Sequence, residues 1–201
     1  MGRVKGGKSW YERHKKDVYR IKASQSGLRS RSTFKLQQIQ SKFKLFSKMD
    51  IVVELGVAPG GWSAYLVDQV RCVVGCDLLP IEPVQGLSFV QGDFTDVSIQ
   101  KKLIDLAGGP PNIICSDMAP NITGIAIRDE AQVISLNQSV IDFTLEYLAK
   151  NGHVIIKLFE SQGVHALIRG LQKDFTKVIR FKPDASRAVS KEFYLIAIKK
   201  N

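Results

Sequence analysis

Three charged residues occupy positions at the ends or in the middle of apolar runs, where packing alone would not select them. Asp117 comes just after the run 112–115, Lys157 interrupts the run 154–159, and Glu192 opens the final apolar run. Lysine is among the side chains least often buried, and a buried lysine either pairs with an acid or loses its proton. These residues could therefore hold or transfer a proton, or they could form a purely structural cluster of salt bridges.

The predicted topology can bring these residues to one place. If the strand that Glu192 opens runs antiparallel to the others, its start lies at the sheet edge where the parallel strands end. Lys35 lies near the expected start of a helix, where the helix dipole gives no reason for a cation. We therefore expect Lys35, Asp117, Lys157 and Glu192 to converge at this edge.

A glycine-rich turn follows the first apolar run. Residues 51–55 are typical of a buried strand, and Gly60–Gly61 permit a sharp bend and close approach to a ligand before an expected helix begins near Trp62. A strand, a turn and a helix in this order form a nucleotide site at the carboxyl end of a parallel strand. The alternative is an ordinary turn without a ligand.

The residues of the turn favour one type of nucleotide. Val57 stands where a dinucleotide site requires its second glycine, and Pro59 removes a backbone N–H that a phosphate would need. Glu54 is a poor neighbour for phosphate but a good one for a cation. S-adenosylmethionine (SAM) carries a sulfonium and an ammonium and no phosphate, so we favour SAM over a dinucleotide.

Two further acids follow the next expected strands. Asp77 ends the second strand, where a carboxylate can accept hydrogen bonds from both ribose hydroxyls; the alternative role is an ordinary helix cap. Asp93 follows the third strand and is placed to accept from an adenine amino group. Phe94 could pack on the adenine ring.

Strands and helices alternate through most of the chain, which indicates an α/β fold with a mostly parallel sheet covered on both faces. After a short basic helix over 9–23, a second helix begins near Phe34 and places Leu36, Ile39, Phe43 and Phe46 on one apolar face. We expect residues 32–201 to form a single domain. The expected strands cover 51–55, 72–77, 87–90, 112–115, 154–159, 176–182 and 193–199, and the later helices cover 62–69, 95–106, 130–149 and 162–173.

Positive charge is concentrated at the amino-terminal end. Residues 1–48 contain 14 Lys/Arg and 2 Asp/Glu, for a net charge of +12, whereas residues 49–201 contain 15 and 17, for a net charge of −2. The expected arm, residues 1–31, also carries Trp10, Tyr11 and Tyr19. Basic and aromatic residues together favour binding to RNA, although a solvated tail would also be basic. We expect the first eight residues to be disordered.

Several other classes are disfavoured. No apolar run is long enough to span a membrane, and the basic amino terminus lacks the apolar segment of a signal peptide. The three cysteines are expected to be buried thiols in a reducing cytoplasm. The histidines show no metal-ligand spacing, and Asp117 is not followed by the Pro-Pro-aromatic sequence used for amino-group methylation. We expect a cytoplasmic monomer without a metal ion or a membrane partner.

Several segments together resemble the FtsJ (RrmJ) family of ribose 2′-O-methyltransferases, over nearly the whole chain from about residue 9. Two departures are Val57, where alanine is usual, and Val189–Ser190–Lys191, where the family often has arginine. The matching segments are Ser30–Leu36, Gly56–Trp62, Cys76–Pro80, Gln91–Phe94 and Ser116–Asn121, together with Lys157 and Glu192.

The resemblance implies a seven-stranded Rossmann-like methyltransferase sheet that binds SAM and methylates a ribose of RNA. It assigns catalysis to Lys35, Asp117, Lys157 and Glu192. The implied substrate is a uridine of large-subunit ribosomal RNA. Transfer RNA methylation, or a non-catalytic role in ribosome assembly, remain alternatives. The resemblance assigns cofactor binding to Gly60, Trp62, Asp77, Asp93 and Asp117.

Overall fold

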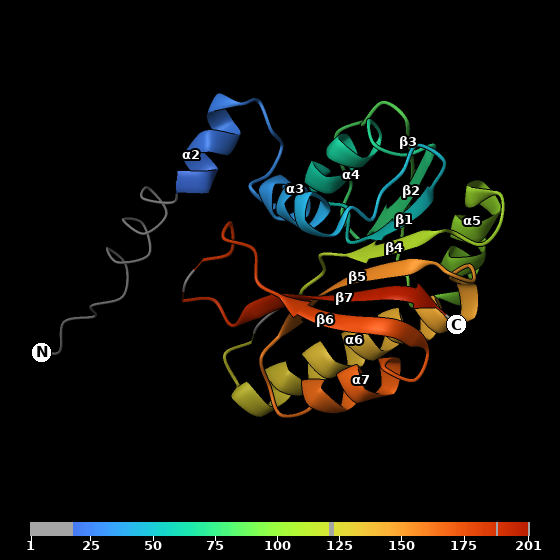
Figure 1. The fold of residues 1–201 in the computed structure, drawn as a ribbon. Coiled ribbons are helices and arrows are strands. Elements are labelled where there is room, and N and C mark those ends of the chain that lie inside the picture. Colours follow the sequence, from blue (N-terminus) through green and yellow to red (C-terminus); the bar gives the residue numbers. More distant parts are fainter. Residues whose placement is uncertain (1–17, 121–122, 188, 201) are drawn as a thin grey trace, which may run out of the picture.

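The computed structural model describes residues 18–120, 123–187 and 189–200. Within them, one seven-stranded sheet has the strand order β3-β2-β1-β4-β5-β7-β6. All neighbouring strands are parallel except β7, which runs antiparallel to both β5 and β6 (Figure 1). The strands are β1 (Ile51–Leu55), β2 (Cys72–Asp77), β3 (Leu87–Gln91), β4 (Ile113–Ser116), β5 (His153–Phe159), β6 (Phe175–Phe181) and β7 (Glu192–Lys200).

The central strands are apolar at nearly every position because both faces of the sheet are covered. Successive side chains of a strand point to opposite faces. In β1, Val53 belongs to one hydrophobic core and Val52 to the other. In β5, Ile156 belongs to the same core as Val53, and Ile155 belongs to the same core as Val52. This arrangement explains the near-continuous apolar runs of the sequence.

Two groups of helices cover the two faces. Helices α3 (Ser32–Phe43) and α4 (Gly61–Leu66) supply side chains to the core that contains Val52, whereas α5 (Val97–Ala107), α6 (Ala126–Tyr147) and α7 (Val164–Leu171) supply the core that contains Val53. Figure 1 shows α6 and α7 beneath the sheet and α3 and α4 above it. The chain reverses its winding between β1 and β4, the point at which such sheets bind ligands.

The segment between α2 (Val18–Gln25) and α3 is tied to distant loops by two arginines. The Arg29 guanidinium donates to the carbonyls of Glu82 and Pro83, at 2.7 and 2.5 Å. Arg31 donates to the carbonyl of Ala185, in the loop before β7. Residues 1–17 lie outside the described residues, and so do the expected disorder of 1–8 and most of the helix expected over 9–23.

The strands and helices expected from residue 32 onward are confirmed, with small corrections. Helix α3 ends at Phe43, so Phe46 is buried from the following loop and not from the helix. Helix α6 begins at Ala126, earlier than expected. Cys76 and Cys115 are buried as expected, but Cys72 is only partly buried.

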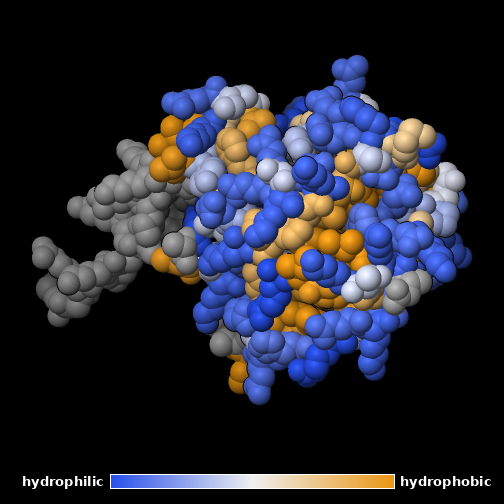
Figure 2. Space-filling model, viewed as in Figure 1, coloured by the Kyte–Doolittle hydropathy of each residue, from blue (hydrophilic) through white to orange (hydrophobic). Residues whose placement is uncertain are grey.

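One surface of the sheet is only partly covered. Figure 2 shows hydrophobic residues gathered in the middle of the face, over β6 and β7, with hydrophilic residues around them. Phe43, Ile179, Phe181 and Ile198 are partly buried hydrophobic residues of this region. None of the helices in the described parts of the chain has the length and apolar character needed to cross a bilayer.

Candidate active site

The glycine turn brings three strand ends together. Gly56, at the end of β1, has a φ of +85°, and a Cβ there would collide with the Met118 side chain that follows β4. The Gly56 N–H donates to the carbonyl of Cys76 in β2 at 2.9 Å. The sequence thus needs glycine here so that the ends of β1, β2 and β4 can lie close to one another.

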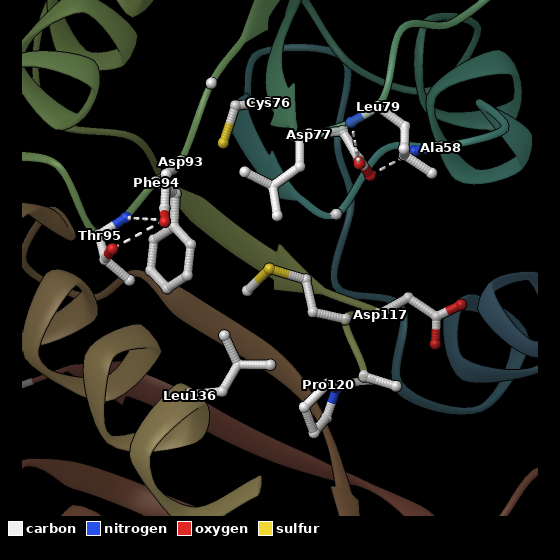
Figure 3. A pocket seen from close by; sticks show the side chains of 15 residues that line it. Ala58, Cys76, Asp77, Leu79, Asp93, Phe94, Thr95, Asp117, Pro120 and Leu136 are labelled. Carbon is white, nitrogen blue, oxygen red and sulfur yellow. Dashed lines mark hydrogen bonds between the residues drawn. The ribbon is translucent and has the colours of Figure 1, made fainter. Parts of the chain in front are cut away.

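A cavity of about 470 Å³ opens beside this turn. Asp77, Asp93 and Asp117 line it at the ends of β2, β3 and β4, and Phe94, Met118 and Leu136 give it an apolar wall (Figure 3). The cavity therefore combines an apolar surface with three carboxylates that come from neighbouring parallel strands. Such a combination suits a nucleoside, which has an apolar ring face and several hydrogen-bond donors.

Asp77 is held by the turn it faces. Its Oδ2 accepts from the Ala58 N–H at 2.8 Å, and its Oδ1 accepts from the Leu79 N–H at 2.9 Å. A carboxylate has about four lone-pair sites, so both oxygens can still accept from a ligand. The alternative that Asp77 caps a helix is wrong, because the chain passes from β2 to β3 through residues 78–86 without a helix.

Asp93 is fixed by a local turn. Its Oδ1 accepts from the backbone N–H and the hydroxyl of Thr95, at 2.9 and 2.7 Å. A carboxylate has further lone pairs, so Asp93 can also accept from a ligand. The neighbouring Phe94 is only 4% exposed and belongs to the core that α5 and α6 cover. Both residues line the cavity, as the sequence-based hypothesis of adenine binding requires.

Gly60 and Trp62 lie outside the residues that line the cavity. Gly60 has a φ of +93°, and a Cβ added there would lie 3.2 Å from the Val84 side chain and 3.5 Å from that of Arg29. The Trp62 side chain is 1% exposed, and its indole N–H donates to the Ser32 carbonyl at 2.8 Å. The structure therefore gives both residues a place in the support of the turn, and their assignment to the cofactor stays a prediction.

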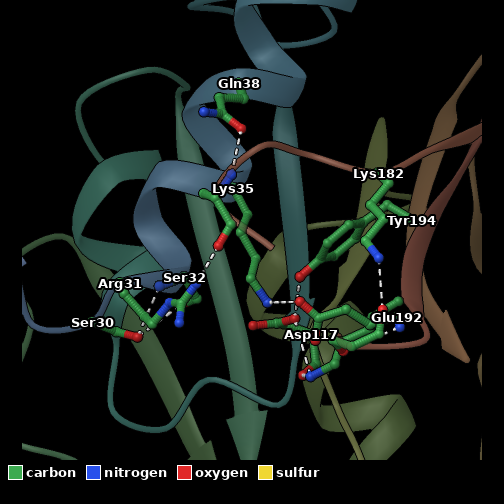
Figure 4. Close-up of polar contacts among 12 residues, drawn as sticks. Ser30, Arg31, Ser32, Lys35, Gln38, Asp117, Lys182, Glu192 and Tyr194 are labelled. Atoms are coloured by element: carbon green, nitrogen blue, oxygen red, sulfur yellow. Dashed lines mark hydrogen bonds and ion pairs between the residues drawn. The ribbon is translucent and has the colours of Figure 1, made fainter. Parts of the chain in front are cut away.

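The structure brings the four charged residues together, as two pairs (Lys35, Asp117 and Glu192 are labelled in Figure 4). Lys157 Nζ lies 3.4 Å from Asp117 Oδ1 and donates to the Asp117 carbonyl at 3.0 Å. Lys35 of α3 forms an ion pair with Glu192 at the start of β7. We call Lys35, Asp117, Lys157 and Glu192 the charged cluster. Its assembly depends on the antiparallel pairing of β7, which sets Glu192 opposite Phe159 at the end of β5.

Tyr194 connects the two pairs, and sequence reasoning missed it. Its hydroxyl donates to Asp117 Oδ1 at 2.6 Å, and Lys35 Nζ lies 5.7 Å from its ring centroid. Burial, followed by the charge of Asp117, raises the pKa of the Tyr194 phenol well above its usual value, so it remains a donor. The signal in the sequence is its position two residues after Glu192, which places both side chains on the same face of β7.

Burial and charge act in opposite directions on the two glutamates. Burial alone would raise the pKa of Glu192, but the ammonium of Lys35 and its hydrogen bond outweigh that effect, and the pKa is lowered. Burial raises the pKa of Glu54 to about 8, and the charges of Asp117 and Asp77 add to the shift. Glu54 accepts from the Ser63 hydroxyl and is not among the residues that line the cavity. It is therefore mostly neutral at pH 7, which weakens the argument that it attracts a cationic ligand.

Comparison with known proteins gives one consistent family. Residues 28–200 match the family model of the FtsJ-like methyltransferases. The chain is 40% identical over 198 residues to the protein named ribosomal RNA large subunit methyltransferase E in Caulobacter sp. (strain K31), covering 98% of this chain and 88% of that one. It is 39% identical to the protein of the same name in Gluconobacter oxydans (strain 621H), covering 98% and 74%.

Solved structures share the fold at lower identity. A Plasmodium falciparum protein described as a ribosomal RNA methyltransferase superposes with a TM-score of 0.76 at 24% identity, covering 86% of this chain and 98% of that chain. A Streptococcus mutans protein described as a methyltransferase, solved in complex with S-adenosylhomocysteine (SAH), gives a TM-score of 0.55 at 14% identity, covering 83% and 94%.

Proposed function

Because the chain belongs to the FtsJ-like methyltransferase family, we propose that it transfers the methyl group of SAM to a ribose 2′-hydroxyl of RNA. The observation that carries the proposal is the double position of Asp117. This residue lines the nucleoside-sized cavity and also contacts Lys157. A methyl donor in the cavity and a ribose at the charged cluster would therefore both lie beside the Asp117 side chain.

The residues of the cavity fit SAM. Asp77 would accept from the ribose hydroxyls, and Asp93 would accept from the adenine amino group. Phe94, Met118 and Leu136 offer the apolar surface that an adenine ring needs. When bound, the cofactor supplies a methyl group on a positively charged sulfur, and the carboxylate of Asp117 would favour that charge nearby.

The charged cluster supports two roles for Lys157. A ribose hydroxyl is a weak nucleophile at neutral pH, so its attack requires removal of its proton or stabilisation of the developing alkoxide. As a neutral amine, Lys157 Nζ would take the proton; as an ammonium, it would stabilise the oxygen. In either role Asp117 orients the amine through the observed contacts. Lys35 and Glu192 would hold the ribose, and such positioning supplies much of the rate.

We further propose large-subunit ribosomal RNA as the substrate, with a uridine as the target. Support comes from the names of the two relatives and from the basic amino-terminal segment. The domain division into an RNA-binding arm, residues 1–31, and a methyltransferase domain, residues 32–201, belongs to the same proposal.

The deciding experiment maps 2′-O-methyl groups in ribosomal and transfer RNA from cells with and without this protein. We expect one ribosomal position to lose its methyl group when the protein is absent. Recombinant protein should restore the mark on unmodified large subunits in the presence of SAM. A methyl group that still appears when the target ribose is replaced by its 2′-deoxy form would place the chemistry on the base and overturn the proposal. Loss of a 2′-O-methyl group from transfer RNA alone would show that the substrate is transfer RNA and not ribosomal RNA.

A further inference from the structure

A second hollow borders the charged cluster, on the side of β6 and β7. It encloses about 430 Å³ and is lined by Glu160, Arg180, Phe181, Lys182, Lys191, Glu192 and Phe193. We call it the β6–β7 groove. Glu192 belongs both to this groove and to the charged cluster, where Lys35 engages it. The cluster thus borders the cofactor cavity through Asp117 and the β6–β7 groove through Glu192.

The groove carries an excess of positive charge. It contains three cations, Arg180, Lys182 and Lys191, and two carboxylates. Both carboxylates are already engaged, since Glu160 pairs with Arg180 and Glu192 pairs with Lys35. Lys182 Nζ donates to the Ser190 carbonyl at 2.6 Å, and Lys191 is exposed. An anion entering the groove would therefore meet Lys182 and Lys191 without a competing free carboxylate.

The groove also presents a flat cationic surface. The Arg180 guanidinium lies over the Phe193 ring, with its central carbon 4.2 Å from the ring centroid. Phe193 is 6% exposed, so the ring holds one face of the guanidinium in place. Nucleobases of single-stranded RNA stack on aromatic rings and on guanidinium planes. The outer face of Arg180 is suited to such a base.

From these observations we infer that the β6–β7 groove binds the nucleotide next to the target ribose, with its base on Arg180 and its phosphate at Lys182 and Lys191. The inference rests on the proposed function, because it takes the charged cluster as the position of the target ribose. A polynucleotide must continue past that ribose. The cofactor cavity, on the side of Asp117, would hold the methyl donor, so the groove on the side of Glu192 is the open path.

The test is direct binding of a short, fluorescein-labelled, mixed-sequence single-stranded RNA to the full chain, by anisotropy, at several salt concentrations. Arg180→Lys keeps the positive charge but removes the planar guanidinium group on which a base could stack. It should weaken binding at least about fivefold, the effect of one lost stacking contact, with an unchanged salt slope. Lys191→Ala should reduce the slope of log affinity against log salt by about 0.7, as expected for one lost phosphate contact on a single strand.

Lys101→Ala, on the exposed face of α5, is the matched control and should bind RNA as the unaltered protein does. Lys191 is exposed, so its truncation should not unfold the chain, and thermal unfolding and SAH binding check each variant. Affinities of Arg180→Lys and Lys191→Ala within twofold of the control would overturn the inference. Methyl transfer is measured separately. An absence of 2′-O-methylation by the unaltered protein would overturn the proposed function, while the anisotropy data would still decide whether the groove binds RNA.

Discussion

In the proposed mechanism, Lys157 is the residue on which methyl transfer depends most. Truncation to alanine removes the amine beside Asp117 and leaves the Tyr194 hydroxyl bonded to that carboxylate. We expect single-turnover methyl transfer at saturating cofactor to fall about 10²–10⁴-fold, as for loss of a general base. Folding and cofactor binding should remain.

The matched control for Lys157→Ala is Lys177→Ala, a lysine on the exposed side of β6. It should transfer methyl groups at the normal rate. If Lys157→Ala turned over normally, the assigned role would be wrong. If it unfolded early and lost its cofactor, the charged cluster would be structural.

Asp77 provides the corresponding test of the cofactor cavity. We expect Asp77→Ala to weaken SAM binding by one or two hydrogen bonds to a charged acceptor, each worth about 1.5–3 kcal/mol. Calorimetry measures this loss. Asp96→Ala is a suitable control, because that carboxylate caps α5 and does not line the cavity. It should lower stability slightly, as a lost cap does, with unchanged SAM affinity. Equal SAM affinities in the two variants would mean that Asp77 does not bind the cofactor.

At the scale of elements, the proposed RNA-binding arm, residues 1–31, includes residues that the structure ties to the rest of the protein. Residues 28–31 are tied to the body of the protein by the hydrogen bonds of Arg29 and Arg31. A deletion that tests RNA binding should therefore stop at residue 26, which removes eight Lys/Arg and leaves both arginines in place.

We expect this deletion to weaken RNA binding and to flatten its salt dependence, by about 0.7–0.9 in log–log slope for each lost phosphate contact. Cofactor affinity should be retained. Anisotropy at several salt concentrations measures both quantities. An unchanged affinity and slope would show that the segment does not contact RNA.

The elements themselves were predictable because their signals are local. Short apolar runs bounded by glycines and polar residues indicated β1 through β5, and the expected ends of these strands indicated Asp77, Asp93 and Asp117. Partner choice was not predictable in the same way. Sequence placed Lys157, Lys35 and Glu192 at one edge, but it could not show that Lys35 would pair with Glu192 and Lys157 with Asp117. Those pairings depend on distances between elements far apart in the chain.

Two residues show the same limit at the glycine turn. Glu54 was expected to face a cationic ligand, yet it bonds to Ser63. The assignment of Trp62 to the cofactor stays a prediction, and the hydrogen bond from its indole to Ser32 is a contact that the sequence did not indicate. A residue's position along a strand or at a helix start indicates its neighbourhood. Its contact partner depends on how the covering helices are placed.

At the scale of the whole molecule, the buried carboxyl of Glu54 makes stability depend on pH. Its pKa rises from about 4.5 in the unfolded chain to about 8 in the folded protein. Between these values the unfolded state loses the proton and the folded state keeps it. The contribution of Glu54 to the free energy of unfolding is therefore complete below about pH 4.5 and is lost as the pH rises to about 8.

Glu54→Gln should remove this dependence while keeping an acceptor for the Ser63 hydroxyl. We expect the variant to gain stability over the unaltered protein as the pH rises from 5 to 9, by more than about 1 kcal/mol, since each pKa unit corresponds to about 1.4 kcal/mol. Urea unfolding across this range measures the difference. The exposed control Glu82→Gln should show no such trend. Parallel curves for all three proteins would mean that Glu54 is ionised in the fold.

The position of β7 also determines when the charged cluster can exist. This strand pairs with both β5 and β6, so the last strand of the described chain is an interior strand of the sheet. The ion-pair partner of Lys35, Glu192, lies 157 residues further along the sequence. During synthesis, β1 through β5 can assemble as the chain lengthens, but β6 has no neighbour and Lys35 no carboxylate until β7 is released from the ribosome. Completion of the sheet and completion of the charged cluster are therefore the same folding event, and a nascent chain that can already form the glycine turn still lacks Glu192 and Tyr194.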